Sequence, residues 1–110
     1  MKHPRQKSPK HLAFIRQLPC VVCGDNTTVE AAHVRFGSQK AAKRHTGMAE
    51  KPDDAWALPL CGRHHRDQHL IGEGVFWGIH YGHRPIFLCL ALWRVSGDIE
   101  AGEQIIREAR

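Results

Sequence analysis

The chain has 110 residues, a formal net charge of +5 with histidine neutral, and an isoelectric point of about 9.3. This length allows one domain and excludes a multidomain architecture. Its content of 42% hydrophobic and 25% charged residues is typical of a globular protein and excludes global disorder. The basic balance favours a polyanionic partner.

No apolar segment resembles a secretory signal or a membrane span, and Ile86–Leu92, the longest candidate, has about a third of the length that a span needs. We therefore expect a cytoplasmic protein with no membrane partner. In that compartment a Cys-x-x-Cys pair binds metal more often than it forms a disulfide.

The N-terminal part is expected to be a tail followed by a short helix. Residues Met1–Lys10 are polar and basic, contain prolines, and predict a flexible tail. His11–Leu18 has the apolar spacing of one amphipathic helix. Ser8 would cap this helix, Pro9 would occupy its first turn, and Pro19 would end it.

Two strands are predicted, separated by a long connection. Cys20–Gly24 forms a tight knuckle, in which the glycine lets two thiolates face one ion. Thr27–Phe36 is partly β-branched and predicts the first strand, and Trp56–Leu60 predicts the second. Gly37–Pro52 is polar and basic, and we expect a functional connecting loop there.

The remainder of the chain is expected to be helical. Gly62–Ile71 carries most of a histidine cluster and predicts a helix, which Gly72 and Gly74 would break. Pro85–Val95 is strongly apolar and predicts a buried helix in preference to a strand. Two further helical segments are predicted: 75–80 and 98–109.

Two ligand pairs predict a structural zinc site: Cys20-x-x-Cys23 and Cys61-x-x-His64. Structural zinc is held tetrahedrally by four such ligands, and here it would join two distant parts of a short chain. His65 also follows Cys61 at a workable spacing and is the alternative fourth ligand. Cys89 lies in an apolar run and is interpreted as a core residue.

Three further histidines are candidates for chemistry. His65 and His69 are four residues apart, so they share one helix face and can hold a second, divalent ion. The alternative is a solvent-facing, hydrogen-bonded pair. His33 lies near the end of the first strand and is the candidate base that activates water, because histidine is largely neutral at pH 7. The alternative is a strand histidine satisfied by the backbone.

Basic residues lie close to these histidines in the sequence. They would position a phosphate backbone without reading base sequence. We expect them to be DNA-binding residues: Arg35, Lys43, Arg44, Arg63 and Arg66.

The order of a Cys-x-x-Cys pair, a strand-end histidine and the segment Leu60–His69 resembles the HNH, or ββα-metal, endonucleases. The resemblance implies an α+β fold: a ββα core with a zinc knuckle over residues 19–72, a short N-terminal helix, and a C-terminal helical extension over 73–110 within one domain, 11–110. It implies His33 as general base and His65 and His69 as ligands of a catalytic Mg²⁺ or Mn²⁺ ion.

A subset of this family, the phage and prophage recombination-enhancement (Ref-type) nucleases, resembles the chain over roughly Lys10 to Tyr81. That resemblance implies a phage- or prophage-encoded protein in a bacterial cell that cuts DNA in concert with a host recombinase filament. It is carried by these stretches: Pro19–Gly24, Ala31–Arg35, Gly47–Met48, Lys51–Asp54, Pro59–His69 and Gly72–Trp77.

Two positions depart from the HNH pattern. Ala32 stands where the family commonly has a metal-binding Asp or His before the base, so His33 is either the base or itself a ligand. The asparagine that orients the base would fall near Trp56 and is absent. Asp53 or Asp54 would replace it, because a carboxylate can orient an imidazole through its second nitrogen.

The sequence therefore predicts a metal-dependent DNA endonuclease that needs no small-molecule cofactor. The alternative is a non-catalytic, zinc-stapled DNA-binding module, which the two departures favour and the additional histidine His69 disfavours. A redox role is disfavoured because the chain has no βαβ pattern.

Overall fold

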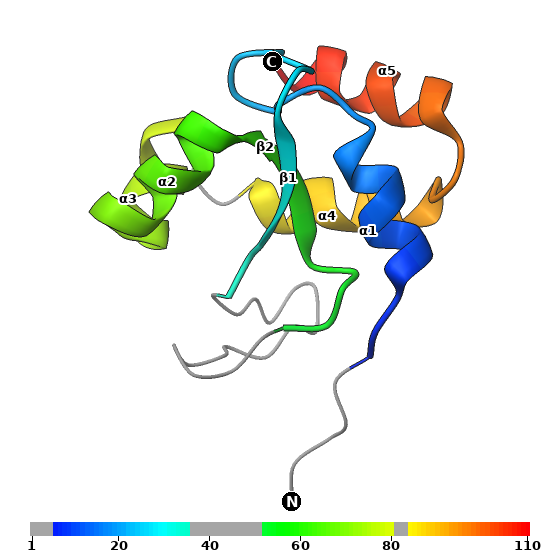
Figure 1. The fold of residues 1–110 in the computed structure, drawn as a ribbon, viewed down its shortest axis with the longest axis horizontal. Helices are drawn as coiled ribbons and strands as arrows, with labels where there is room; N and C mark the ends of the chain where they lie inside the picture. Colours follow the sequence, from blue (N-terminus) through cyan, green and yellow to red (C-terminus); the bar gives the residue numbers. More distant parts are fainter. Residues whose placement is uncertain (1–5, 36–51, 81–83) are drawn as a thin grey trace, which may run out of the picture.

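The computed structural model describes residues 6–35, 52–80 and 84–110, and over these ranges it shows a small α+β fold (Figure 1). The α+β class that the sequence predicts is thereby confirmed. A two-stranded sheet lies between five helices. The elements in chain order are α1 (Pro9–Arg16), β1 (Val29–His33), β2 (Ala57–Cys61), α2 (Gly62–Ile71), α3 (Glu73–His80), α4 (Pro85–Arg94) and α5 (Ile99–Ala109).

The two strands pair antiparallel in a register that sets the two ends of the sheet apart. Val29 lies opposite Cys61 at one end, and His33 lies opposite Ala57 at the other. Four residue steps at about 3.3 Å separate these ends by roughly 13 Å. The metal-ligand candidate Cys61 and the base candidate His33 therefore belong to opposite ends of the sheet.

Helix α1 begins as its sequence predicts, with Pro9 in the first turn and the Ser8 hydroxyl accepting the backbone N–H of His11 at 3.3 Å. The expected flexible tail is corrected in part, because Ser8 donates its backbone N–H to Asp54 at 2.7 Å. Gln6 likewise donates to Asp53 at 2.8 Å. The chain is thus bound to the domain from Gln6 onward, and residues 1–5 lie outside the described residues.

Strand β1 is shorter than predicted for a local reason. The Asp25 carboxylate accepts both the backbone N–H of Thr27 at 2.9 Å and its hydroxyl at 2.7 Å, so Thr27 belongs to a turn and the strand begins at Val29. The predicted connecting loop, 37–52, lies outside the described residues except for Pro52.

The helix boundaries follow the glycine and cap signals with one exception. Gly72 ends α2 with a φ of +91°, which favours glycine. Gly74, predicted as a second breaker, lies inside α3 instead. The apolar segment from Pro85 is the predicted buried helix, and Asp98 caps α5 by accepting the N–H of Ala101 at 3.1 Å.

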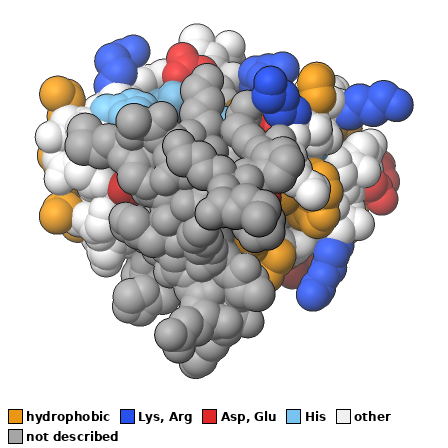
Figure 2. Space-filling model, turned by 90° about the horizontal axis from the view of Figure 1, so that it is seen from below, with side chains coloured by type: hydrophobic (Ala, Val, Ile, Leu, Met, Phe, Trp, Pro, Cys, Tyr) orange, Lys and Arg blue, Asp and Glu red, His pale blue; other side chains and the backbone are white. Residues whose placement is uncertain are grey.

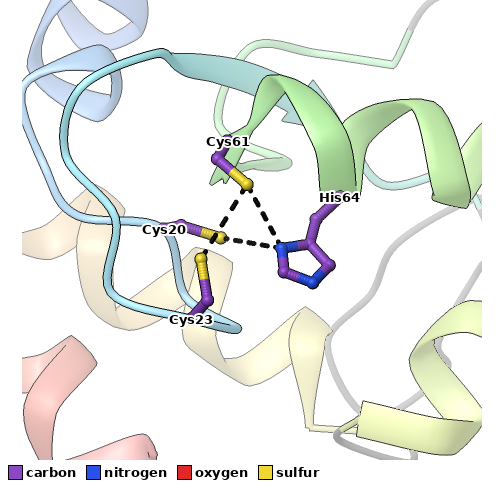
Figure 3. A group of neighbouring side chains, drawn as sticks. All are labelled: Cys20, Cys23, Cys61 and His64. Atoms are coloured by element: carbon purple, nitrogen blue, oxygen red, sulfur yellow. Dashed lines mark hydrogen bonds between the residues drawn. The ribbon is translucent and has the colours of Figure 1, made fainter.

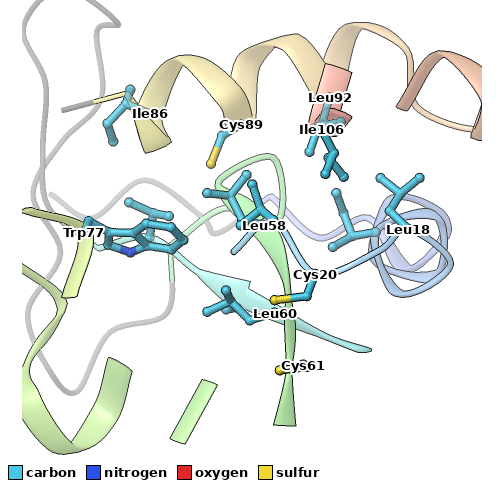
Figure 4. Packing of buried hydrophobic residues seen from close by; sticks show 14 of the residues in the cluster. Leu18, Cys20, Leu58, Leu60, Cys61, Trp77, Ile86, Cys89, Leu92 and Ile106 are labelled. Carbon is cyan, nitrogen blue, oxygen red and sulfur yellow. The ribbon is translucent and has the colours of Figure 1, made fainter. Parts of the chain in front are cut away.

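The hydrophobic core lies between the sheet and the helices before and after it (Figure 4). Strand β2 is buried along its whole length, and Leu58 and Leu60 are completely buried. Helix α4 contributes Cys89 and Leu92 to the same cluster, so Cys89 is a core residue as predicted. The C-terminal helices therefore complete the core. Within the described ranges, no helix has the length and apolar character needed to span a membrane.

Two helical glycines predict opposite effects of the same substitution. A Cβ on Gly102 of α5 would lie 2.9 Å from both Leu18 and Phe14 of the opposing segment, whereas a Cβ on Gly78 of α3 would meet nothing within 4 Å. We expect Gly102→Ala to lower the free energy of unfolding by about 1–3 kcal/mol through overpacking. Gly78→Ala should raise it by about 0.5–1 kcal/mol, because alanine restricts the unfolded chain. Urea titration measures both, and stabilisation by Gly102→Ala would contradict the packing described.

His11 predicts a loss of stability in mild acid. Its side chain is 1% exposed, and its Nδ1 lies 2.8 Å from the Ser96 hydroxyl. Burial lowers its pKa below 6.5, and the negative charge of Asp54 opposes this only in part. Folding therefore favours the neutral ring, so its contribution is complete above about pH 6.5 and is lost as the pH falls below that value.

His11→Asn removes the titration and keeps an amide near Ser96. The difference in free energy of unfolding between wild type and His11→Asn should therefore shrink between pH 7.5 and pH 5. A difference that is constant with pH would show that His11 has its ordinary pKa.

Candidate metal centre

Four side chains from two distant parts of the chain converge on one point (Figure 3). Cys20 and Cys23 come from the loop after α1, Cys61 ends β2, and His64 lies in the first turn of α2. Their ligand atoms all lie within 4.8 Å of one another. This Cys₃His group is the one set of three or more potential ligands found within residues 6–35, 52–80 and 84–110.

Three of the six distances between ligand atoms of the Cys₃His group are close to the edges of a tetrahedral zinc site. Zn–S bonds of about 2.3 Å and a Zn–N bond of about 2.0–2.1 Å give S···S edges of about 3.8 Å and S···N edges of about 3.6 Å. The Sγ atoms of Cys23 and Cys61 are 3.9 Å apart, and His64 Nδ1 lies 3.7 Å from Cys20 Sγ and 3.2 Å from Cys61 Sγ. Three thiols and one imidazole form a complete structural zinc ligand set.

The backbone of the knuckle explains why the first two thiols face the same point. Gly24 N–H donates to Cys20 O at 2.8 Å, and Gly24 has a φ of +80°, where a side chain would be strained. Val21 N–H donates to Pro59 O at 2.9 Å and fixes the knuckle against β2. The sheet thus positions the first ligand pair against the second.

The environment of His64 favours the neutral ring that a metal ligand requires. Burial lowers the pKa of His64 below 6.5, the positive charges of Arg63 and His80 lower it further, and Asp67 opposes them. His65, the alternative fourth ligand, is not part of the group. Its Nδ1 lies 2.6 Å from Glu30 Oε1 on β1 instead.

The base candidate His33 is paired with an acidic residue at the other end of the sheet. Its Nε2 lies 3.0 Å from Asp54 Oδ1, and Asp54 is 2% exposed. The second Asp54 oxygen accepts the backbone N–H of Ser8, whereas the Asp53 carboxylate is engaged by Gln6. Of the two aspartates that the sequence offered, the structure places Asp54 against His33.

The three histidines predicted for the catalytic site lie in two places. The rings of His65 and His69 lie 4.9 Å apart, as expected for one helix face. However, His33, His65 and His69 do not form a group of neighbouring ligand atoms in the described part of the chain. His65 contacts Glu30, and His33 contacts Asp54. The catalytic ion site therefore stays a prediction.

The predicted DNA-binding residues are distributed unequally. Arg63 and Arg66 are exposed on α2, and Arg35 is half-buried with its backbone N–H 2.6 Å from Glu73 Oε1. Lys43 and Arg44 lie outside the described residues. Histidine, basic and acidic side chains lie near one another on the face shown in Figure 2.

Two acidic residues were not singled out from the sequence. Glu30 contacts His65, and Glu73 accepts the backbone N–H of Arg35. Glu30 has a recognisable signal, because it is the one acidic residue in the predicted strand 27–36. Glu73 has none, because its contact depends on the tertiary position of α3.

A family model named DUF968, protein of unknown function, matches residues 1–96. The chain belongs to this family. The family is associated with phage and prophage proteins. A search of the curated proteins and a search of the solved structures found no match.

The Cys₃His group predicts one zinc ion per chain with His64, and not His65, as its ligand. His64→Asn should abolish stoichiometric zinc and leave the chain unfolded, because structural zinc contributes about 10–16 kcal/mol, as much as the whole stability of a small domain. His65→Asn should keep the zinc and the fold. Metal analysis and circular dichroism on both variants measure this, and loss of zinc from His65→Asn alone would reverse the assignment.

Proposed function

We propose that this protein is a metal-dependent endonuclease of the HNH type that hydrolyses DNA phosphodiester bonds. The observation that carries the proposal is the hydrogen-bonded pair His33–Asp54, held at the end of the sheet away from the Cys₃His group. A strand-end histidine with a buried carboxylate partner is an arrangement suited to general-base catalysis, because the carboxylate orients the imidazole. The exposed side chains of Arg63, Arg66 and His69 on α2 agree with a phosphate-binding surface.

In this proposal Asp54 orients the base. The Nε2–H group of His33 would donate a hydrogen bond to Asp54, which fixes the tautomer. Nδ1 is then the basic nitrogen that takes a proton from water. The Asp54 carboxylate is itself held by Ser8 at 2.7 Å, so the ring has one favoured orientation. Asp54 would thus replace the motif asparagine that is absent from its expected place near Trp56.

The divalent ion would be held on α2. Glu30 accepts from His65 Nδ1 and thereby presents Nε2 as a ligand, with His69 one turn later. Two imidazoles fit Mn²⁺ better than Mg²⁺, which prefers oxygen ligands. The ion would supply positive charge against the phosphate oxygens. The zinc of the Cys₃His group would hold the fold and take no part in the chemistry.

The biological setting in this proposal is phage or prophage DNA recombination or processing. It is supported by the resemblance to Ref-type nucleases and by the association of the family with phage and prophage proteins. A host recombinase filament on DNA is the partner that the resemblance implies. The proposed cellular location is the bacterial cytoplasm, where such a filament assembles.

One observation favours a second candidate, the non-catalytic zinc-stapled DNA-binding module. His33 lies in a different cluster from His65 and His69, so the chain offers no preformed constellation of base and metal within the described residues. This candidate predicts salt-dependent DNA binding that is unchanged by substitution of His33 or His69.

Nicking of supercoiled DNA in Mn²⁺ or Mg²⁺ separates the two candidates. We expect wild-type protein to nick DNA, alone or with a recombinase filament, and His33→Ala to lower the rate by about 10²–10⁴-fold. Asp54→Asn should lower it by about 10- to 100-fold through loss of the correct tautomer. Asp53→Asn is the matched control, because Asp53 contacts Gln6 and not His33.

The rates can be compared only if each variant keeps the zinc content and the circular dichroism spectrum of the wild type. Equal nicking by wild type and His33→Ala would show that His33 is not the base. DNA binding without nicking under all these conditions would establish the binding module instead.

A further inference from the structure

Two arginines and a histidine converge on an open hollow beside the metal-binding knuckle. We call this hollow, of about 480 Å³, the basic pocket; it is lined by Val22, His80, Arg84, Ala109 and Arg110. Among these described lining residues none carries a carboxylate side chain. The pocket lies outside the residues that the proposed nuclease chemistry uses.

Arg84 is the N-cap residue of helix α4. It is the residue before Pro85 and makes no side-chain cap to the helix, while its Nη2 donates to Ala109 O at 3.2 Å. This hydrogen bond holds the guanidinium against the C-terminal end of α5.

Arg110 and His80 are positioned by the knuckle and by the residues around it. The Arg110 guanidinium lies so close to Gly24 that a Cβ there would be 2.9 Å from Arg110 Cζ. The His80 ring lies 4.6 Å from the ring of Phe76 and 6.0 Å from that of His64. The C-terminal end of α5 lies beside the knuckle loop in Figure 1, in agreement with these contacts.

We propose that the basic pocket binds a backbone phosphate of DNA that flanks the phosphate at His33. The choice of DNA as the source of the phosphate rests on the proposed function. Guanidinium groups match phosphate geometry and bind it through charge-assisted hydrogen bonds. Val22 lies between two ligands of the Cys₃His group, so the pocket belongs to the Cys61 end of the sheet and not to the His33 end.

The two ends of the sheet are roughly 13 Å apart, from four residue steps at about 3.3 Å each. The basic pocket and His33 therefore cannot hold the same phosphate. A phosphate in the basic pocket is therefore a positioning contact and not the bond that is cut. It would make the C-terminal helices, which the Ref-type resemblance does not cover, part of the DNA-binding surface.

The two ends of helix α4 supply a matched pair of variants. Arg84 precedes the helix and lines the pocket, whereas Arg94 lies exposed in its last turn and does not line it. Arg84→Gln and Arg94→Gln remove the same charge. Binding of a short fluorescent DNA duplex is measured by anisotropy without Mg²⁺ or Mn²⁺, over about 50–200 mM salt.

We expect Arg84→Gln to weaken binding about tenfold, because a charge-assisted hydrogen bond is lost. The slope of log K against log salt should become shallower by about 0.9, the value for one phosphate contact. Arg94→Gln should leave the slope unchanged, and Arg84→Lys should restore it. Retained zinc content shows that the knuckle is intact in each variant.

Equal slopes for Arg84→Gln and Arg94→Gln would overturn the proposal. The proposal would also be overturned if the pocket bound small anions only. Inorganic phosphate would then stabilise wild type but not Arg84→Gln, and the two proteins would bind DNA equally well. Failure of the proposed function gives a different result. If the protein never nicks DNA but Arg84→Gln removes one phosphate contact, this inference stands and the proposed nuclease function fails. If the protein nicks DNA but Arg84→Gln leaves the slope of log K against log salt unchanged, the proposed function stands and this inference fails.

Discussion

The rest of the fold depends on one constraint, the meeting of two distant chain segments at the Cys₃His group. It joins the loop after α1 to the point where β2 ends and α2 begins, 38 residues later from Cys23 to Cys61. A chain of 110 residues buries a limited core, so a metal held by this group would replace packing that a larger domain would have. The register of the sheet and the direction of α2 both start from this point.

The orientation of α2 follows from its first turn. Because His64 faces the thiols, helical geometry turns His65 away from them by about 100°. His65 then reaches Glu30 on β1, and His69 lies one turn further along the same exposed face. Two adjacent histidines of the same chemical type thus acquire separate environments, one buried among sulfur atoms and one beside a carboxylate.

The far end of the sheet is organised by Asp54, a buried residue whose contacts come from the N-terminal segment and from β1. It accepts from Ser8 before α1, its backbone N–H donates to Gln6 O at 3.0 Å, and its Oδ1 lies 3.0 Å from His33. Such a buried carboxylate is stable only when its oxygens are hydrogen-bonded. The N-terminal segment therefore supports the His33–Asp54 pair as well as the core.

Local signals in the sequence determined the helices, the ligand spacing and the α+β class. Ser8-Pro9 starts α1, Gly72 ends α2, and two x-x spacings select the four zinc-ligand candidates, because caps, turns and chelate spacing act within a few residues. The tertiary structure alone decided between His64 and His65 and between Asp53 and Asp54. It also separated His33 from the histidine pair of α2. These choices depend on sheet register and helix rotation, which bring together residues far apart in sequence and leave no trace in any local pattern.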